Sequence, residues 1–108
     1  MMSDNNGQWG RRDVRVTVIV RAWLRDEAAR LDTERCLRSV RAAGKPGRMR
    51  VIAVLAETYF TDELQEIYTH SDTVLSLDDN YGAVRATNLG LALAMLDPSE
   101  FVLVLDND

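Results

Sequence analysis

The sequence predicts an α/β fold in which a parallel β-sheet is flanked by helices, and two observations carry this prediction. Four short apolar runs rich in β-branched residues have the pattern of strands that are buried on both faces. Segments with apolar residues at helical spacing separate these runs, and such alternation builds a parallel sheet with right-handed crossovers. The chain has 108 residues, 46% of them hydrophobic and 28% charged, which fits a single globular domain.

The first predicted strand is followed by a helix and a second strand. Residues 14–20 are β-branched and nearly continuous, as expected for a strand covered on both faces. Residues 31–43 have helical spacing, and Gly44 and Pro46 end this helix. The next apolar run, residues 51–56, is the second strand. The apolar positions of the helix are Leu31, Cys36, Leu37, Val40 and Ala43.

A short helix leads from the second strand to the third. Thr61 or Asp62 can cap this helix, and Gln65 completes a capping box with Asp62. Residues 73–77 then form a third, shorter strand. The inward positions of the short helix are Leu64, Ile67 and Tyr68.

The last helix and strand follow a loop rich in turn residues, 78–82. Residues 83–96 form the helix, Pro98 ends it, and residues 101–105 form the fourth strand. One stripe of the helix faces inward. An inward Asn88 needs a hydrogen-bond partner, so we interpret it as a brace for the preceding loop. The stripe contains Val84, Asn88, Leu91 and Met95.

These strands predict a Rossmann-like sheet with the spatial order 3-2-1-4. Ligands of open α/β sheets bind outside the carboxyl ends of the strands at a switch point, which here lies between the first and fourth strands. Glu57 follows the second strand, and Asp106 follows the fourth. Acidic groups therefore gather on the rim where a nucleotide would bind.

The fourth strand runs directly into an Asp-x-Asp sequence, Asp106-Asn107-Asp108. Hard cations such as Mg²⁺ are bound by one or two carboxylates together with substrate phosphates. The two carboxylates therefore predict a divalent metal site that holds a diphosphate.

The single cysteine and the single histidine do not indicate catalysis or zinc binding. Cys36 cannot form an intramolecular disulfide or a cysteine-rich zinc site, and it lies on the apolar side of a predicted helix. We interpret it as a core residue. His70 lies where the short helix ends, a position in which a solvated histidine suits the helix dipole.

The N-terminal residues and the longest apolar runs show no targeting or membrane signal. Residues 1–13 are polar and predict a disordered leader. No apolar run approaches the roughly 18 to 20 residues of a membrane span, so we expect a cytoplasmic protein whose membrane association would need regions outside this sequence.

Basic and acidic residues are unevenly distributed. Residues 1–50 hold 12 of the 13 lysines and arginines, and residues 51–108 hold 11 of the 17 acidic residues. The arginines are spread over several elements without interleaved aromatic residues, which does not fit nucleic-acid binding. We interpret them as a solvated face, or as a patch near anionic lipid or a partner.

The fourth strand would leave a hydrophobic sheet edge uncovered, which natural folds avoid. We therefore expect the chain to be the N-terminal part of a longer protein. The same bare edge makes self-association of the chain plausible.

Four segments together resemble the nucleotide-binding half of a family 2 glycosyltransferase of the GT-A fold. Residues 16–20 resemble the opening strand of that family, and residues 35–40 resemble its first helix. Residues 80–91 resemble its Asn-x-Gly loop and following helix, which is the most specific match. Residues 101–108 resemble the strand that leads into its Asp-x-Asp motif. The resemblance covers about residues 14–108, which it identifies as a truncated nucleotide-sugar-binding half-domain.

The resemblance implies that Mg²⁺ or Mn²⁺ grips the diphosphate of a UDP- or GDP-type sugar donor. Asp108 would be the direct metal ligand, and Asp106 would contact the ribose or the metal. Glu57 replaces the aspartate that binds the base. The donor site would also include Ala22, Asn80 and Gly82.

The implied reaction transfers the sugar to an acceptor hydroxyl of a saccharide, lipid or protein. Its catalytic base would lie beyond Asp108, so this chain alone would be inactive.

Two other functions stay open at this stage. The segments at 21–24 and 57–62 depart from the family pattern, which is compatible with a non-catalytic binding domain that keeps the fold without the metal. A receiver-like regulatory module also groups acids around Mg²⁺. It would need an acidic pair after the first strand, where this chain has Arg21 and Ala22.

Overall fold

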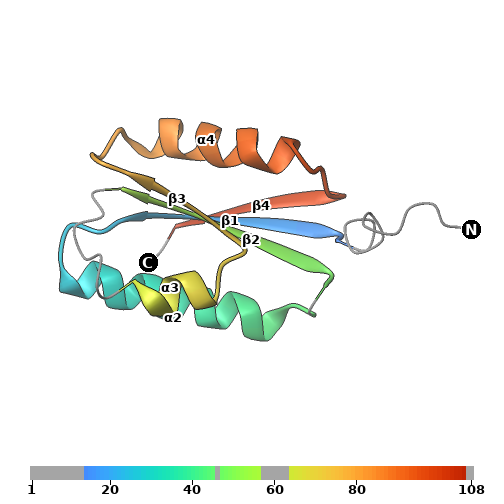
Figure 1. Cartoon of the computed structure of the whole chain (residues 1–108), viewed down its shortest axis with the longest axis horizontal. Helices are drawn as coiled ribbons and strands as arrows, with labels where there is room; N and C mark the ends of the chain where they lie inside the picture. Colours follow the sequence, from blue (N-terminus) through green and yellow to red (C-terminus); the bar gives the residue numbers. More distant parts are fainter. Residues whose placement is uncertain (1–13, 46, 57–63, 107–108) are drawn as a thin grey trace, which may run out of the picture.

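The computed structural model describes residues 14–45, 47–56 and 64–106. Strands and helices alternate along them, and the four strands form one parallel sheet in the order β3-β2-β1-β4 (Figure 1). The α/β fold and the 3-2-1-4 strand order predicted from the sequence are therefore confirmed. The elements are β1 (Val16–Trp23), α2 (Glu27–Ala43), β2 (Met49–Ala56), α3 (Gln65–Thr69), β3 (Thr73–Leu77), α4 (Ala83–Met95) and β4 (Phe101–Asp106).

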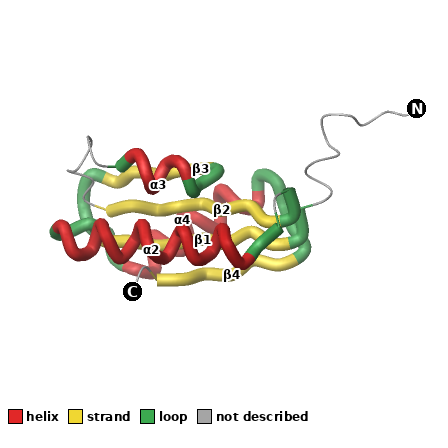
Figure 2. The backbone as a smooth tube through the Cα atoms, turned by 90° about the horizontal axis from the view of Figure 1, so that it is seen from below, coloured by secondary structure: helices red, strands yellow, loops and turns green. Residues whose placement is uncertain are grey.

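Helices cover both faces of the sheet. α2 and α3 lie on one face and α4 on the other (Figure 1), and Figure 2 shows α2 running roughly along the direction of the strands. The helices on each face of the sheet cover a separate core cluster of apolar side chains. Leu37 of α2 and Ile67 of α3 are fully buried in the first cluster, and Ile19 is fully buried in the second. Burial of these apolar side chains is the main source of stability for the fold.

Alternation along β1 decides which side chains reach each face of the sheet. Val18 and Val20 belong to the cluster beneath α2, and Ile19 belongs to the cluster beneath α4. Because successive strand residues point to opposite faces, Arg21 shares the α4 face with Ile19. β1 continues to Trp23, three residues past its predicted end, and so carries Arg21 as a strand residue.

The two helices on the α2 side differ from the sequence prediction in their starts and inward faces. α2 begins at Glu27 because Asp26 caps it: the Asp26 carboxylate accepts a hydrogen bond of 2.8 Å from the backbone N–H of Ala29. Leu31 and Tyr68, both predicted to face inward, are exposed. Of the predicted capping box, Thr61 and Asp62 lie outside the described residues, and α3 follows Leu64, which makes no side-chain cap hydrogen bond.

The predicted inward face of α4 is wrong at Val84, Asn88 and Met95, whereas Leu91, the fourth predicted position, packs against the second core cluster. Val84 is 76% exposed, and Asn88 and Met95 are exposed as well. The buried positions are Ala86, Gly90 and Ala94, which lie one above another at four-residue spacing.

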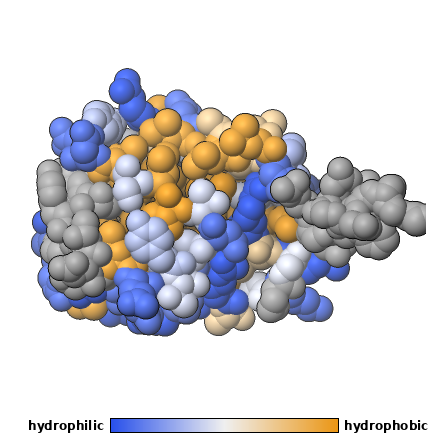
Figure 3. All heavy atoms as spheres, viewed as in Figure 1, coloured by the Kyte–Doolittle hydropathy of each residue, from blue (hydrophilic) through white to orange (hydrophobic). Residues whose placement is uncertain are grey.

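Small residues on this stripe let α4 approach the sheet closely. A Cβ added to Gly90 would lie 2.6 Å from Cγ2 of Ile19, so only glycine fits there without a shift of the strand side chain. Val84 and Met95 of α4 point outward instead, and hydrophobic surface is visible at the α4 side of the molecule in Figure 3.

Arg30 and Arg50 are largely buried and form ion pairs, so the solvated-face interpretation is wrong for them. In α2, Arg30 pairs with Glu34, and their side chains are only 11% and 8% exposed. Arg50 of β2 pairs with Asp97 at 3.1 Å and also donates to Oγ1 of Thr17 at 2.9 Å. Arg50 thus joins the sheet to the segment after α4.

β4 forms one edge of the described sheet, because it pairs with β1 alone. Phe101, Val102 and Leu103 are all exposed along it, which confirms the predicted hydrophobic edge. Among the described residues, no helix is long and apolar enough to cross a membrane.

Candidate functional site

A pocket of about 250 Å³ opens at the carboxyl ends of β1 and β4. Its lining includes Ala22, Asn80, Gly82 and Asp106, which are the four described residues that the sequence predicted for the donor site. The structure therefore brings the ends of two strands and the start of α4 together at the predicted switch point. Glu57 and Asp108, the other predicted site residues, lie outside the described residues.

Arg21 also lines this pocket, although it is not among the site residues predicted from the sequence. It lies opposite Asp106 in the register of β1 and β4, and its Nη2 donates to Oδ1 of Asp106. Its Nη1 donates to Oγ1 of Thr87 at 2.8 Å and to the carbonyl oxygen of Ala83 at 3.2 Å. The guanidinium thus ties both strand ends to the first turn of α4.

The Nε donor of Arg21 takes no part in this network. This group is buried and makes no hydrogen bond with a described residue. A buried N–H without a partner costs free energy, which offsets part of the stabilisation from the other hydrogen bonds of Arg21.

Asp106 meets part of the requirement for a metal ligand. One carboxylate oxygen accepts from Arg21, while the side chain is 58% exposed and lines the pocket, which leaves Oδ2 for a cation. Within the described residues no group of three or more metal-ligating side chains exists. A cation held here would therefore depend on Asp106, the predicted ligand Asp108 and phosphate oxygens, the small carboxylate number that Mg²⁺ accepts.

The first turn of α4 faces the same pocket, whose lining includes Gly82 and Ala83. Gly82 precedes the helix and provides no side-chain cap, so the first backbone N–H groups of α4 have no intrahelical partner. The Asn80 side chain holds the turn, because its Oδ1 accepts from the N–H of Gly82 at 3.1 Å. Helix starts of this kind attract anions.

Gly82 has φ 94° and ψ 159°, a conformation that is essentially restricted to glycine. No atom lies within 4 Å of a Cβ built there, so the constraint is backbone strain and not space. We expect Gly82→Ala to lower the free energy of unfolding by about 1–3 kcal/mol. Chemical denaturation would measure this, and Gly47→Ala should be destabilised for the same reason, because Gly47 also has positive φ in open space. A Gly82→Ala variant as stable as the parent chain would contradict the constraint.

Two further aromatic side chains border the site. Arg25 lies over the ring of Trp23 at 5.2 Å from its centroid, and both line the pocket. Trp23 is 41% exposed, so it does not fill the core edge. Outside the pocket lining, Tyr81 donates to Oδ1 of Asp78 at 2.5 Å, and this hydrogen bond raises the pKa of the Tyr81 hydroxyl.

The remaining sequence predictions have mixed outcomes. Cys36 packs against the first core cluster, and burial raises the pKa of its thiol, which disfavours the thiolate. His70 is the C-terminal cap residue of α3, as predicted. Asn88 is exposed on the outer side of α4, so it does not brace the loop from within.

The chain matches no model of a known protein family, and no curated protein matches it. The pocket therefore has to be interpreted from its own chemistry. It combines two guanidinium groups, one carboxylate, an indole ring and an uncapped helix start. That combination suits a ligand with negative charge and a flat aromatic or polar part.

Proposed function

We propose that this chain binds the nucleoside diphosphate part of a nucleotide-sugar donor, as the donor-binding half of a glycosyltransferase. The observation that carries the proposal is the convergence of Ala22, Asn80, Gly82 and Asp106 on one pocket at the carboxyl ends of β1 and β4. These four residues come from three separate segments of the sequence.

The pocket offers complementary groups for a diphosphate. Arg21, Arg25 and the uncapped N–H groups of α4 provide positive charge at one end of the sheet. In the proposal, Mg²⁺ or Mn²⁺ held by Asp106 and Asp108 neutralises the charge that develops on the leaving diphosphate. Trp23 lies where a base could stack.

A second candidate function is a donor-binding domain that works without metal. The Arg21–Asp106 ion pair favours it, because a guanidinium already balances the carboxylate that a metal would use. In that case Arg21 and Arg25 alone neutralise the phosphates, and the domain binds a nucleotide without catalysing transfer.

The first experiment is calorimetric titration of the chain with UDP and GDP, with Mn²⁺ and then with EDTA. If the function is metal-assisted, we expect the affinity for one nucleotide to be higher by about tenfold or more in Mn²⁺ than in EDTA, because cation–phosphate contacts add to the protein contacts. Equal affinity in both buffers would support the metal-free function. If circular dichroism shows that the chain is folded and neither nucleotide binds, both the metal-assisted and the metal-free function are contradicted for this chain on its own.

A further inference from the structure

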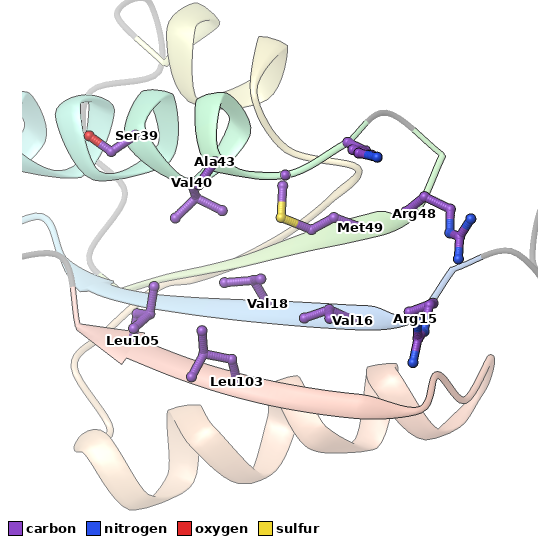
Figure 4. Close-up of a pocket in the computed structure, with 12 residues that line it drawn as sticks. Arg15, Val16, Val18, Ser39, Val40, Ala43, Arg48, Met49, Leu103 and Leu105 are labelled. Atoms are coloured by element: carbon purple, nitrogen blue, oxygen red, sulfur yellow. The ribbon is translucent and has the colours of Figure 1, made fainter.

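A second and larger cavity lies at the other end of the sheet. Its volume is about 480 Å³, within the range of small-molecule sites. α2 forms its roof through Val40 and Ala43, while Val16 and Val18 of β1 line the floor (Figure 4). β4 adds Leu103 and Leu105 to the floor.

The apolar lining is only partly used by the core of the protein. Val18 is buried, but Val16, Val40 and Leu105 are half-buried, and Leu103 is 49% exposed. The apolar side chains therefore offer surface that a ligand could remove from water.

Positive charge is concentrated at one end of this cavity. Arg15 and Arg48 lie together at the amino end of β1 (Figure 4), and the backbone N–H of Arg15 donates to the carbonyl oxygen of Arg48 at 2.9 Å. Lys45 also lines the cavity, and no acidic side chain is among its described lining residues. Arg15 pairs with Glu100, whereas Arg48 and Lys45 form no ion pair with a described residue.

We propose that this cavity binds an anionic amphiphile, a single acyl chain that ends in a carboxylate or phosphate. The chain lies between α2 and the strands β1 and β4, and the head group is held by Arg48, Lys45 and Arg15. Charge complementarity selects this occupant, because Lys45 and Arg48, with the ion-paired Arg15 beside them, place net positive charge at one end of an apolar cavity, which matches an anion on an apolar tail. The proposal is independent of the nucleotide site, which lies at the opposite ends of the same strands.

The apolar lining predicts how the binding affinity depends on the length of the acyl chain. Each methylene removed from water strengthens binding by roughly fourfold. Dodecanoate is therefore expected to bind about tenfold or more tightly than decanoate. Dodecyltrimethylammonium has the same tail with a cationic head, and we expect it to bind about tenfold or more weakly than dodecanoate.

The test titrates the full chain with monomeric dodecanoate and follows binding by calorimetry. Arg48→Glu is expected to weaken binding about tenfold, because one attractive charge becomes repulsive. Arg35→Glu is the matched control: it makes the same charge change on the outer face of α2 and should leave the affinity unchanged. Ala43→Phe should block the cavity, whereas Ala42→Phe places the same ring on an exposed neighbour that does not line it.

Flotation with vesicles tests whether the acyl chain belongs to a membrane lipid or to a free fatty acid. The vesicles contain phosphatidylcholine, alone or mixed with phosphatidylglycerol. The proposal is supported if the chain binds dodecanoate or the vesicles and both Arg48→Glu and Ala43→Phe weaken that binding. Binding of neither, or binding that these variants leave unchanged, overturns it. A dimer that Ala43→Phe dissociates in sedimentation, without binding of amphiphile, would also overturn it and would identify the occupant as a second copy of the chain.

Discussion

Replacing Asp106 with asparagine is expected to weaken Mn²⁺-dependent UDP or GDP binding by about tenfold to a hundredfold, because even outer-shell partners of a metal contribute that much. Asparagine keeps the shape of the side chain and an oxygen that can accept from Arg21, so the fold should persist. Binding in EDTA should not weaken, since removing an anion from the pocket does not disfavour phosphate. Calorimetry in both buffers measures the two affinities.

Two companion variants make this result specific. Asp32→Asn on α2 has the same change of charge away from the pocket and should leave binding unaltered. Arg21→Met removes the guanidinium: the metal-assisted function predicts that Mn²⁺ still strengthens nucleotide binding, because Asp106 is released to the metal. The metal-free function predicts that binding is lost in both buffers. Should Asp106→Asn retain the full effect of Mn²⁺, the metal role of Asp106 is wrong.

The position of the pocket was predictable because strand ends in a parallel sheet meet at one edge. Continuous β-branched runs fixed where β1 and β4 lie in the sheet, and alternation with helices made them parallel neighbours. Asp106 and Ala22 then had to lie on the same rim. The polar loop before α4 completes that rim through Asn80 and Gly82.

Arg21 was missed because a strand end is hard to place from sequence. The apolar run ends at Val20, so the predicted strand stops before Arg21, whereas β1 continues to Trp23. The alternation of side chains along a strand could have identified Arg21. Residue 21 lies two positions after Ile19, so in a longer strand its side chain points to the same face, the one that α4 covers. A guanidinium beside a strand-ending aspartate then follows from the register.

The face of α4 was assigned wrongly for a different reason. The prediction selected the larger apolar residues, among them Val84 and Met95, as the buried stripe. Close helix–sheet packing instead selects the smallest side chains, and the spacing of Ala86, Gly90 and Ala94 was the signal for it. Apolar size alone does not identify a contact face when the two layers approach closely.

Gly90→Leu is therefore expected to be strongly destabilising. A Cβ at this position already meets Cγ2 of Ile19 at 2.6 Å and Cγ2 of Val54 at 3.3 Å. Branched side chains of a central strand cannot move aside freely, so the leucine must displace α4 or distort the core. We expect the free energy of unfolding to fall by about 3 kcal/mol, measured by urea denaturation.

Helix propensity acts in the opposite direction and sharpens the test. Leucine is a better helix former than glycine by nearly 1 kcal/mol, so any loss must come from packing. Ala92→Leu is the matched control, because residue 92 is exposed on the same helix and should change stability by no more than about 0.5 kcal/mol. Ile19→Ala removes the side chain that Gly90→Leu would meet, so the double variant should be less destabilised than the sum of the two single changes. If the two changes were strictly additive, α4 would not pack against Ile19. The explanation that close packing positions the start of α4 at the pocket would then be wrong.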